Sequence, residues 1–359
     1  MKKILHKILL SVNILFAFAL LISYLSVHIN PELFILPAFF GLAFPYLLLV
    51  NIFFSIIWAV LLRYEAIISV IVIAIGFTHL SNYIRFGKSN ESTDNSFKVI
   101  SYNVKLFDNY GNPDNNTEEI IIDFLKNQDA DIICLQEFYL YGDPEKKDSE
   151  IKNALGDNYF SHMKLTGSGK NRYYGIATFS RYPIVQKGQI IHPRSSSLTI
   201  FSDVIIGHDT LRIFNNHLQS FRLKNMNRSF FDEMTAGDNN ETFGLFKSLA
   251  ASLKKGFVIR AQQAEALKTQ INISEYPVIV VGDFNDTPVS WSYRKIRKGL
   301  NDSFVSAGYG AGFTYRGNYP SNRIDYILYD DALECRFFDI LRVKYSDHYP
   351  VSAFFARPF

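Results

Sequence analysis

Cysteine is scarce in this sequence, with Cys134 and Cys335 the two examples among 359 residues. Two cysteines this far apart provide neither a disulfide framework nor a Cys-x-x-Cys motif. An excess of charge of one sign is also missing, because 37 basic residues face 34 acidic ones and the formal net charge is +3. This balance argues against a protein that binds polyanions through bulk charge. The 48% of apolar residues excludes a disordered chain.

Charged residues are rare in residues 1–88, which hold six basic and two acidic residues beside 60 apolar ones. The remaining 271 residues contain 31 basic and 32 acidic residues. The mild basicity of the chain therefore belongs to its hydrophobic part, and the larger part is nearly neutral. We predict two regions of different kind, with the boundary near Lys88.

Three long apolar runs occupy the first region, at residues 8–27, 33–62 and 66–84. Runs of this length can cross the ~30 Å hydrocarbon layer of a bilayer. We therefore predict three N-terminal transmembrane helices within residues 1–88. The alternative for the first run is a cleavable signal peptide, because Lys2, Lys3 and Lys7 precede it, but the run is long and no small-x-small cleavage site follows.

Basic residues near the ends of these runs predict the orientation. The N-terminus and the second loop carry Lys2, Lys3, Lys7 and Arg63, whereas the segment after the third run carries Arg85 and Lys88. The bias favours a cytoplasmic N-terminus. With three spans, the rest of the chain would lie outside the cytoplasm, so we expect a multi-pass protein of the cell membrane whose partner is the lipid bilayer. No obligate protein partner is evident.

The polar residues 89–96 are typical of a linker, and after them the apolar runs become short. Helical patterns at 118–126 and 260–271 separate some of these runs. Residues 97–359 are therefore predicted to form an α/β domain with layered sheets. The predicted strands are Lys98–Tyr102, Asp131–Leu135, Gly175–Phe179, Leu198–Ile206, Leu211–Asn215, Pro277–Val281, Arg323–Tyr329 and Val351–Ala356.

Residues 218–260 are too long for a common loop between a strand and a helix. They combine aromatic residues such as Phe230 and Phe246 with basic ones such as Lys247 and Lys254. The plainest interpretation is a helical insertion that packs on its own domain. The alternatives are a substrate lid and a basic, apolar surface that touches lipid headgroups.

Carboxylates, imidazoles and amides lie at the ends of several predicted strands. Each one alone would be ordinary turn chemistry, but a sheet can bring the whole set together. Hard carboxylate and amide oxygens without cysteine suit Mg²⁺ or Mn²⁺ better than structural zinc. The residues are Asn103, Glu137, His217, Asp283, Asn285, Asp325, Asp347 and His348.

In this order, the segments resemble the endonuclease/exonuclease/phosphatase family, which includes deoxyribonuclease-like and sphingomyelinase-like phosphoesterases. The resemblance covers roughly residues 97–359. It implies a four-layer α/β/β/α sandwich that hydrolyses phosphoesters with a divalent metal. The segments are Ser-Tyr-Asn103, Leu-Gln-Glu137, Asn-Asn-His217, Gly-Asp283-Phe-Asn285, Arg-Ile-Asp325-Tyr and Ser-Asp347-His348.

The resemblance also implies a role for each residue. Glu137, Asn103 and Asp347 would hold the metal. Asp283 would position or deprotonate the attacking water, and Asn285 and His217 would contact the phosphate. His348 would face the scissile phosphate, with Asp325 orienting its imidazole.

We therefore predict a membrane-anchored, Mg²⁺- or Mn²⁺-dependent phosphodiesterase or phosphatase with an extracytoplasmic catalytic domain. Its substrate would be a lipid headgroup, a small phosphoester or nucleic acid. The first alternative is a non-specific metal-dependent endonuclease. A catalytically silent binding module is disfavoured because every acid and imidazole of the set is present, and a transporter or sensor is disfavoured because no strongly charged residue lies mid-span.

Overall fold

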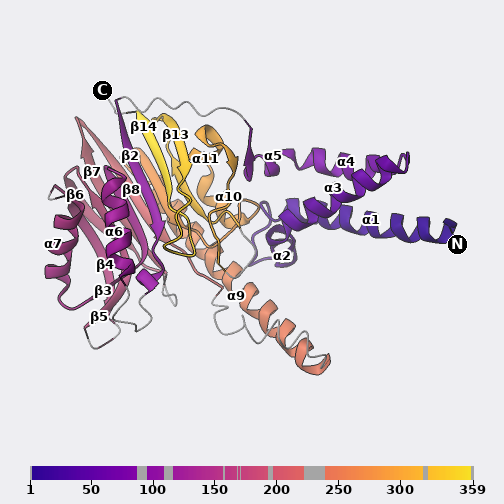
Figure 1. Ribbon diagram of the computed structural model, residues 1–359, viewed down its shortest axis with the longest axis horizontal. Helices are drawn as coiled ribbons and strands as arrows, with labels where there is room; N and C mark the ends of the chain where they lie inside the picture. Colours follow the sequence, from indigo (N-terminus) through magenta and orange to yellow (C-terminus); the bar gives the residue numbers. More distant parts are fainter. Residues whose placement is uncertain are drawn as a thin grey trace. The chain divides into compact units, whose positions relative to one another are not determined.

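The computed structural model describes residues 2–86, 95–108, 116–156, 158–167, 169, 171–192, 197–221, 239–317 and 322–356 (Figure 1). The chain divides into two compact units. Unit 1 contains residues 1–83, 220–264 and 286–295, and unit 2 contains residues 84–219, 265–285 and 296–359. Residues 89–94 of the predicted linker lie outside the described residues.

Unit 2 is built on two six-stranded sheets. The order in one sheet is β13 (Cys335–Ile340), β14 (Val351–Ala356), β2 (Ser96–Asn103), β3 (Ile132–Tyr141), β5 (Arg172–Ser180) and β4 (Phe160–Gly167). The order in the other is β10 (Asn301–Asp302), β12 (Asp325–Tyr329), β9 (Val278–Asp283), β8 (Asp209–His217), β7 (Leu198–Ile206) and β6 (Ile184–Ile190). A separate short pair joins β1 (Ile84–Arg85) to β11 (Gly310–Ala311).

Parallel pairing occurs once in each sheet, between β2 and β3 and between β8 and β9. The other neighbouring strands in both sheets run antiparallel. Parallel strands point towards the same edge of a sheet. The end of β2 therefore lies beside Gln136 of β3, and the last residues of β8 and β9 lie together. This arrangement is what carries polar residues from four separate segments to the edge of the sheets.

The main core lies between the two sheets. Val99 and Cys134 from one sheet and Ile213, Val281 and Ile327 from the other are all fully buried in it. Side chains alternate between the faces of a strand, so the β-branched positions of these strands supply the inner layer. Burial of each such side chain contributes roughly 1.5–3 kcal/mol relative to exposure.

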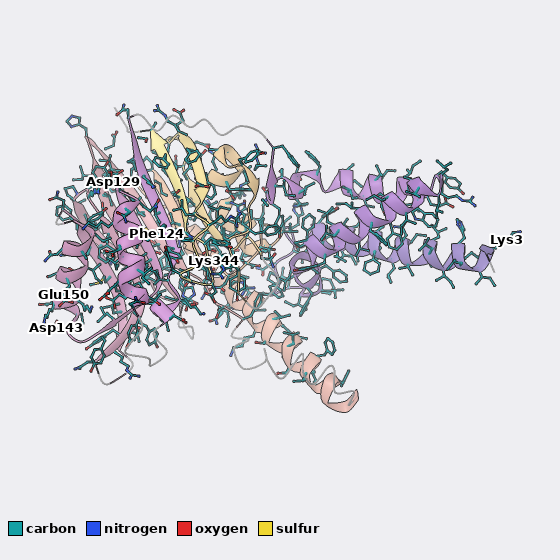
Figure 2. All side chains as sticks on the ribbon, viewed as in Figure 1. Lys3, Phe124, Asp129, Asp143, Glu150 and Lys344 are labelled. Carbon is teal, nitrogen blue, oxygen red and sulfur yellow. The ribbon has the colours of Figure 1, made fainter. Side chains whose placement is uncertain are left out.

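Helices α6 (Thr117–Asn127) and α7 (Pro144–Leu155) cover the outer face of the sheet that contains β3 (Figure 1). Leu125 of α6 and Leu155 of α7 pack there in a second apolar cluster. Asp143, labelled in Figure 2, begins α7 as its N-cap by accepting from the backbone N–H of Glu145 at 2.9 Å. A shorter helix, α11 (Ser303–Ala307), contributes Phe304 to the core between the sheets.

The prediction of an α/β domain with packed sheets and outer helices is confirmed. Two differences concern length and edges. The predicted strand at 131–135 continues as β3 to Tyr141, and the predicted helix at 260–271 is the end of the longer α9 (Asn239–Asn272). Strands β4 and β6 were missed because each is only partly buried and its sequence is largely polar. Strand β13 was missed because Arg336 and Asp339 interrupt its apolar residues.

Unit 1 contains the apolar helices of the N-terminal region. They are α1 (Lys2–Leu25), α2 (Leu36–Leu42), α3 (Phe44–Val60), α4 (Ala66–Ile75) and α5 (Phe77–Leu80). The first part of α9 and residues Asp286–Lys295, with most of α10 (Trp291–Arg297), complete the unit.

The prediction of three transmembrane helices is wrong in its number. Among the described residues, one helix, Lys3–Leu25, is long and apolar enough to cross a membrane. The run at 33–62 is broken between α2 and α3, which are bent by 68° and would add a second span only if counted together. Pro37 and Pro45 cannot donate backbone hydrogen bonds, and each begins a new helix. The third run breaks at Gly76, which leaves α4 with ten residues, about 15 Å.

Helices α1, α3 and α4 pack along one another within unit 1. At one end, His6 of α1 lies 3.1 Å from Glu65, at the turn between α3 and α4. At the other end, the Tyr24 ring of α1 stacks on His79 at 5.2 Å. The turn between α3 and α4 therefore lies near the start of α1, and His79 lies near the end of α1.

The bundle buries a small polar network among apolar side chains such as Leu20 and Phe54, and its exterior is apolar. Asn13 donates to the Ser69 hydroxyl at 2.6 Å, Ser69 donates to Asn51 at 3.1 Å, and the Trp58 indole N–H donates to Asn13 at 2.9 Å. All four side chains are completely buried. The exposed side chains of the bundle include Leu5, Ile8, Leu15, Phe18, Leu49, Phe53, Ile56, Val60, Ile67, Val70, Ile71 and Ile75.

Candidate active site

The polar residues predicted from the sequence lie at one edge of the two sheets of unit 2. Asn103 ends β2, His217 ends β8, and Asp283 ends β9. Asp325 begins β12 and is paired with Asp283 across the antiparallel strands. His217 is paired with Asp283 on the other side. Four of the predicted residues thus come together because two parallel strands end where an antiparallel strand begins.

Glu137 reaches the same edge through an irregularity in its strand. The register between β3 and β5 shifts between Leu135 and Phe138, and Glu137 has a φ of +47°. A bulge of this kind redirects a side chain that regular pleating would point elsewhere. The Glu137 carboxylate consequently lies 3.5 Å from the Asn103 amide nitrogen and 3.6 Å from His217 Nε2.

Asp283 is the centre of the cluster and is almost completely buried. Its Oδ2 accepts a hydrogen bond from the Asn103 amide at 3.0 Å and another from the Asn285 amide at 3.1 Å. The same oxygen lies 3.8 Å from both His217 Nε2 and His348 Nε2. Burial raises the pKa of Asp283 to about 6, although the charge of His348 opposes the rise.

His348 and Asp325 form a buried pair. His348 Nδ1 lies 3.0 Å from Asp325 Oδ2 and 3.1 Å from Oδ1, so the ring donates to the carboxylate and directs Nε2 towards Asp283. Burial alone lowers the pKa of the imidazole, but the charges of Asp325 and Asp283 outweigh it and raise that pKa to about 10. The imidazole therefore carries a positive charge near neutral pH. The ring of Tyr315 packs edge-on against it at 5.1 Å.

Backbone geometry around Asp283 depends on a glycine. Gly282 has a φ of +131°, and a Cβ there would lie 1.9 Å from the backbone oxygen of Asn216. Only glycine allows β9 to approach β8 this closely immediately before Asp283. On the other side, Asn285 has a φ of +52°, and its backbone N–H donates to Asp283 Oδ1 at 2.8 Å.

The donor set fits a divalent cation. Glu137, Asp283 and Asp325 place three carboxylates in a small volume beside one protonated imidazole. His217 Nε2 is buried without a hydrogen-bond partner and faces both Glu137 and Asp283. Asp283, Asp325 and His348 also lie close enough to share an ion, but a charged imidazole does not ligate a metal. Glu137 and Asn103 are therefore the better candidates.

Asp347 lies beside the positively charged side chain of Lys105. Its carboxylate is 4.0 Å from Lys105 Nζ, and the Ser346 hydroxyl before it donates to the Asn103 backbone oxygen at 2.8 Å. Lys105 belongs to a left-handed turn, Lys105–Asp108, in which all four residues have φ between +49° and +55°. Its backbone N–H donates to Asn103 Oδ1 at 3.0 Å, which fixes the orientation of that amide.

Sequence reasoning missed Lys105 and the amides beneath the cluster. Gln136 donates to Asn215 Oδ1 at 2.8 Å, and both side chains are completely buried. This bond joins β3 of one sheet to β8 of the other directly below the site. The sequence did offer a signal, because Gln136 and Asn215 are amides in apolar strands next to predicted site residues. An amide buried in the core must find a hydrogen-bond partner there.

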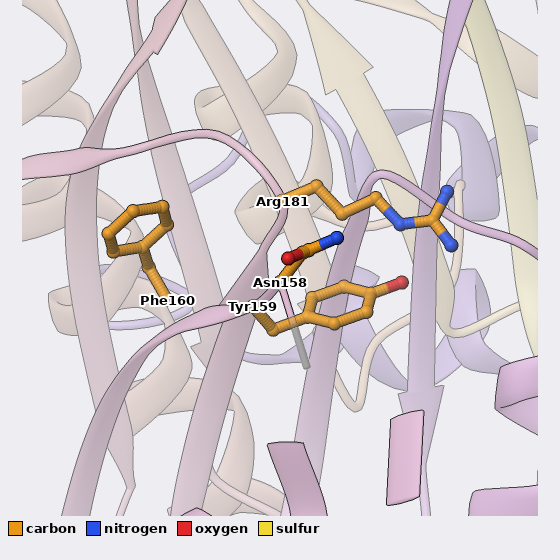
Figure 3. A pocket seen from close by; sticks show the side chains of 4 residues that line it. All are labelled: Asn158, Tyr159, Phe160 and Arg181. Carbon is orange, nitrogen blue, oxygen red and sulfur yellow. The ribbon is translucent and has the colours of Figure 1, made fainter. Parts of the chain in front are cut away.

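The cavity drawn in Figure 3 lies away from this cluster. Its volume is 570 Å³, and it is lined by Asn158, Tyr159, Phe160 and Arg181. Phe160 pairs with Ser180, which lies beside Ile132 at the start of β3, five residues before Glu137. Arg181 is paired with Asp129 at 2.5 Å, and Tyr159 donates to the Ala130 backbone oxygen. None of the predicted site residues lines this cavity.

Two family models match the sequence. The model described as "Endonuclease/Exonuclease/phosphatase family" matches residues 100–348. A model described as a domain of unknown function matches residues 6–83. No curated protein matches the chain.

Several solved structures share the fold. An endonuclease/exonuclease/phosphatase family protein from Leptotrichia buccalis has a TM-score of 0.51 and 16% identity, over 72% of this chain and 98% of that one. Humanized TDP2 of D. rerio has a TM-score of 0.52 and 16% identity, over 74% and 99%. The mannosyl-6-phosphatase Bt3783 of Bacteroides thetaiotaomicron has a TM-score of 0.50 and 19% identity, over 72% and 99%. At these identities the likeness shows the fold alone.

Proposed function

The chain belongs to the endonuclease/exonuclease/phosphatase family, and on that premise we propose that it is a membrane-anchored, divalent-metal-dependent phosphoester hydrolase whose catalytic unit lies outside the cytoplasm. Members of this family are hydrolases that act on phosphoesters. The observation that carries the proposal is the buried Asp283 carboxylate, held between the Asn103 amide and two imidazoles. The complete set of acids and imidazoles argues against a silent binding module.

Each residue of the cluster is proposed to have a separate role in an in-line attack on phosphorus. Asp283, with a pKa of about 6, is ionised at neutral pH and can accept the proton of an attacking water. His348 stays protonated and faces Asp283, so its charge can stabilise the negative charge that develops on the phosphate oxygens. Asp325 holds the ring in that orientation. Asn285 and His217 would contact the phosphate from the other side of Asp283.

A divalent cation at this edge would neutralise the phosphate charge and act as a Lewis acid. Glu137 and Asn103 would hold it, and Asp347 is proposed to complete its surroundings. Mg²⁺ and Mn²⁺ are the candidates because the donors are carboxylate and amide oxygens.

We expect a bell-shaped dependence of kcat on pH. Activity should rise as Asp283 loses its proton near pH 6 and fall as His348 loses its proton near pH 10. In Asp325→Asn, the negative charge that raises the pKa of both the His348 imidazole and the Asp283 carboxyl is absent, so both limbs should move to lower pH. The alkaline limb should move further, because Asp325 also accepts a hydrogen bond from the imidazole. The pH profile of kcat on a chromogenic phosphodiester measures both limbs. An unchanged alkaline limb in the variant would exclude His348 as the group that titrates there.

Hydrolysis should require a divalent metal and should be selective for one class of substrate. The purified full-length protein would be offered plasmid DNA, sphingomyelin, inositol phosphates, mannose 6-phosphate and a chromogenic bis-phosphodiester, each with Mg²⁺, Mn²⁺ or a chelator. We expect chelation to abolish turnover and added Mg²⁺ or Mn²⁺ to restore it. Chelator-resistant hydrolysis would contradict the metal proposal, and cleavage of DNA alone would favour the endonuclease alternative.

The anchoring part of the proposal is supported by the polarity of unit 1. A water-soluble bundle carries many polar side chains on its surface, whereas the surface of this bundle exposes leucine, isoleucine and phenylalanine. Its hydrogen bonds among Asn13, Asn51 and Ser69 are buried between the helices. Hydrogen bonds of this kind join helices within a membrane. Lys2, Lys3 and Lys7 at the start of α1 favour a cytoplasmic N-terminus.

Because unit 1 returns to the end of the bundle at which α1 finishes, residues after position 83 are expected on the side opposite the N-terminus. Reporter fusions after residue 30 and after residue 359 should therefore both report an extracytoplasmic position. The protein should also stay in the membrane fraction after alkaline carbonate extraction. A cytoplasmic C-terminal reporter would overturn the orientation, and release by carbonate would overturn the anchor.

A further inference from the structure

The first half of α9 carries exposed aromatic and basic side chains. Residues 243–257 belong to unit 1 and form about four helical turns, roughly 21 Å long. Phe243 is 72% exposed and Phe246 is 48% exposed. A phenylalanine as exposed as Phe243, one helical turn from the half-exposed Phe246, indicates a contact with another apolar phase.

The exposed aromatic and basic residues share one face of the helix. Their positions follow the spacing i, i+3, i+4, i+7, i+11 and i+14, which places them in a single stripe. The stripe consists of Phe243, Phe246, Lys247, Ala250, Lys254 and Phe257. All but Phe257 are exposed, and Lys255 lies beside the stripe and is also exposed.

The end of this stripe is fixed against the N-terminal helices of the same unit. The Phe257 ring packs edge-on against Phe39 of α2 at 5.5 Å, and the Gln262 amide donates to the Glu32 carboxylate at 2.6 Å. Both Glu32 and Phe39 lie between the end of α1 and the start of α3, at the end of the apolar bundle. The stripe therefore begins where the proposed membrane-embedded helices end.

A neighbouring face of α9 is already covered. Ser252 donates to the Phe221 backbone oxygen at 2.7 Å, and the Arg260 guanidinium lies 4.1 Å from the centre of the Phe221 ring. Arg260 is also paired with Asp286 at 3.1 Å. These contacts fix the rotation of the helix about its axis, so the aromatic and basic stripe is held outward.

We infer that residues 243–257 of α9 form an interfacial helix that binds the anionic headgroups of the bilayer holding α1. The inference rests on the anchoring part of the proposed function. Phenylalanines would enter the boundary between headgroups and acyl chains, while Lys247, Lys254 and Lys255 would extend to the lipid phosphates. The positive charge of this segment favours anionic lipid, because it contains lysines and no acidic residue occurs between Phe243 and Ala264.

Hydrogen exchange in nanodiscs tests this directly. The full-length protein would be placed in discs of phosphatidylcholine alone or of phosphatidylcholine with phosphatidylglycerol, and the amides of residues 243–256 followed. We expect exchange on the order of 10-fold slower in the anionic discs. The double variant Lys247→Glu, Lys254→Glu should lose this difference, and Phe243→Ser, Phe246→Ser should weaken protection in both discs.

Lys146→Glu with Lys187→Glu, two exposed positions in unit 2, is the matched control and should behave as wild type. Equal exchange in both discs, or unchanged protection in the charge-reversed helix, would overturn the inference. So would protection that appears in detergent with rising protein concentration, which indicates a second copy, or on addition of inorganic phosphate, which indicates a lid. Failure of the chain to co-purify with either disc would instead contradict the anchor itself.

Discussion

Replacing Asp283 with alanine is expected to lower kcat on a phosphodiester by at least ~10²-fold. Its carboxylate contacts Asn103, Asn285 and both imidazoles, so its removal takes away the proposed base and the centre of the hydrogen-bond network. His348→Ala should have a loss of similar size, because it removes the charge that faces the phosphate. Steady-state kinetics with Mg²⁺ measure both.

The conservative variant separates chemistry from folding. Asp283→Asn keeps the volume of the side chain but cannot accept a proton, so kcat should fall as in the alanine variant. Burial of the carboxylate raises its pKa, which means that the ionised form is held unfavourably. The amide removes this cost but accepts hydrogen bonds through one oxygen where Asp283 uses two, so the effects should offset and the unfolding midpoint should change little. Asp209→Asn and His208→Ala, at exposed positions of the turn between β7 and β8, serve as matched controls. Wild-type turnover in Asp283→Asn would refute the assignment.

Arg323→Met is expected to lower the free energy of unfolding by about 3–5 kcal/mol. Arg323 pairs with Asp302, and both side chains are completely buried. The guanidinium also lies 4.5 Å from the Phe304 ring centre and 4.8 Å from that of Tyr326. Without it, the buried Asp302 carboxylate loses this counter-charge, and a typical domain has only about 5–15 kcal/mol of stability to lose.

Denaturant unfolding of the detergent-purified chain measures this loss. Arg336→Met is the matched control, because that arginine is partly exposed and lies 3.9 Å from an exposed Glu334, so its removal should change stability by less than about 1 kcal/mol. Adding Asp302→Asn to Arg323→Met should recover part of the stability by removing the uncompensated charge. Equal midpoints for the two arginine variants would contradict a stabilising role for the buried pair.

Several features of the fold could be predicted because they depend on local patterns. Val278–Val281 is a continuous run of β-branched residues, which is typical of a strand buried on both faces of a sheet. It forms β9, in which every residue is buried. The acids and amides that follow such runs lie at strand ends wherever the strands pair. The order of these segments along the chain, from Asn103 to His348, was therefore sufficient to identify the family.

The interruptions in the apolar runs were harder to predict. Composition alone cannot tell a straight helix from two helices bent by 68°, because both contain the same leucines and phenylalanines. Proline at 37 and 45 and glycine at 76 are the local causes, but whether such residues kink or end a helix depends on what packs around them. The hydrogen bonds among the buried Asn13, Ser69 and Asn51 could not be predicted either. Each is a single polar residue within an apolar run, and the sequence does not show which of them face one another.

The sequence by itself determined which chemical groups are available and that they follow strands. It also determined that the chain has one strongly apolar region and one nearly neutral region. Tertiary structure decided the rest, because electrostatics depends on distance and burial. It turned Glu137 by a bulge, placed Asp325 3.0 Å from the His348 ring, and brought Lys105 beside Asp347 through a left-handed turn. The charged state of His348 exists only because those contacts outweigh the burial of the imidazole.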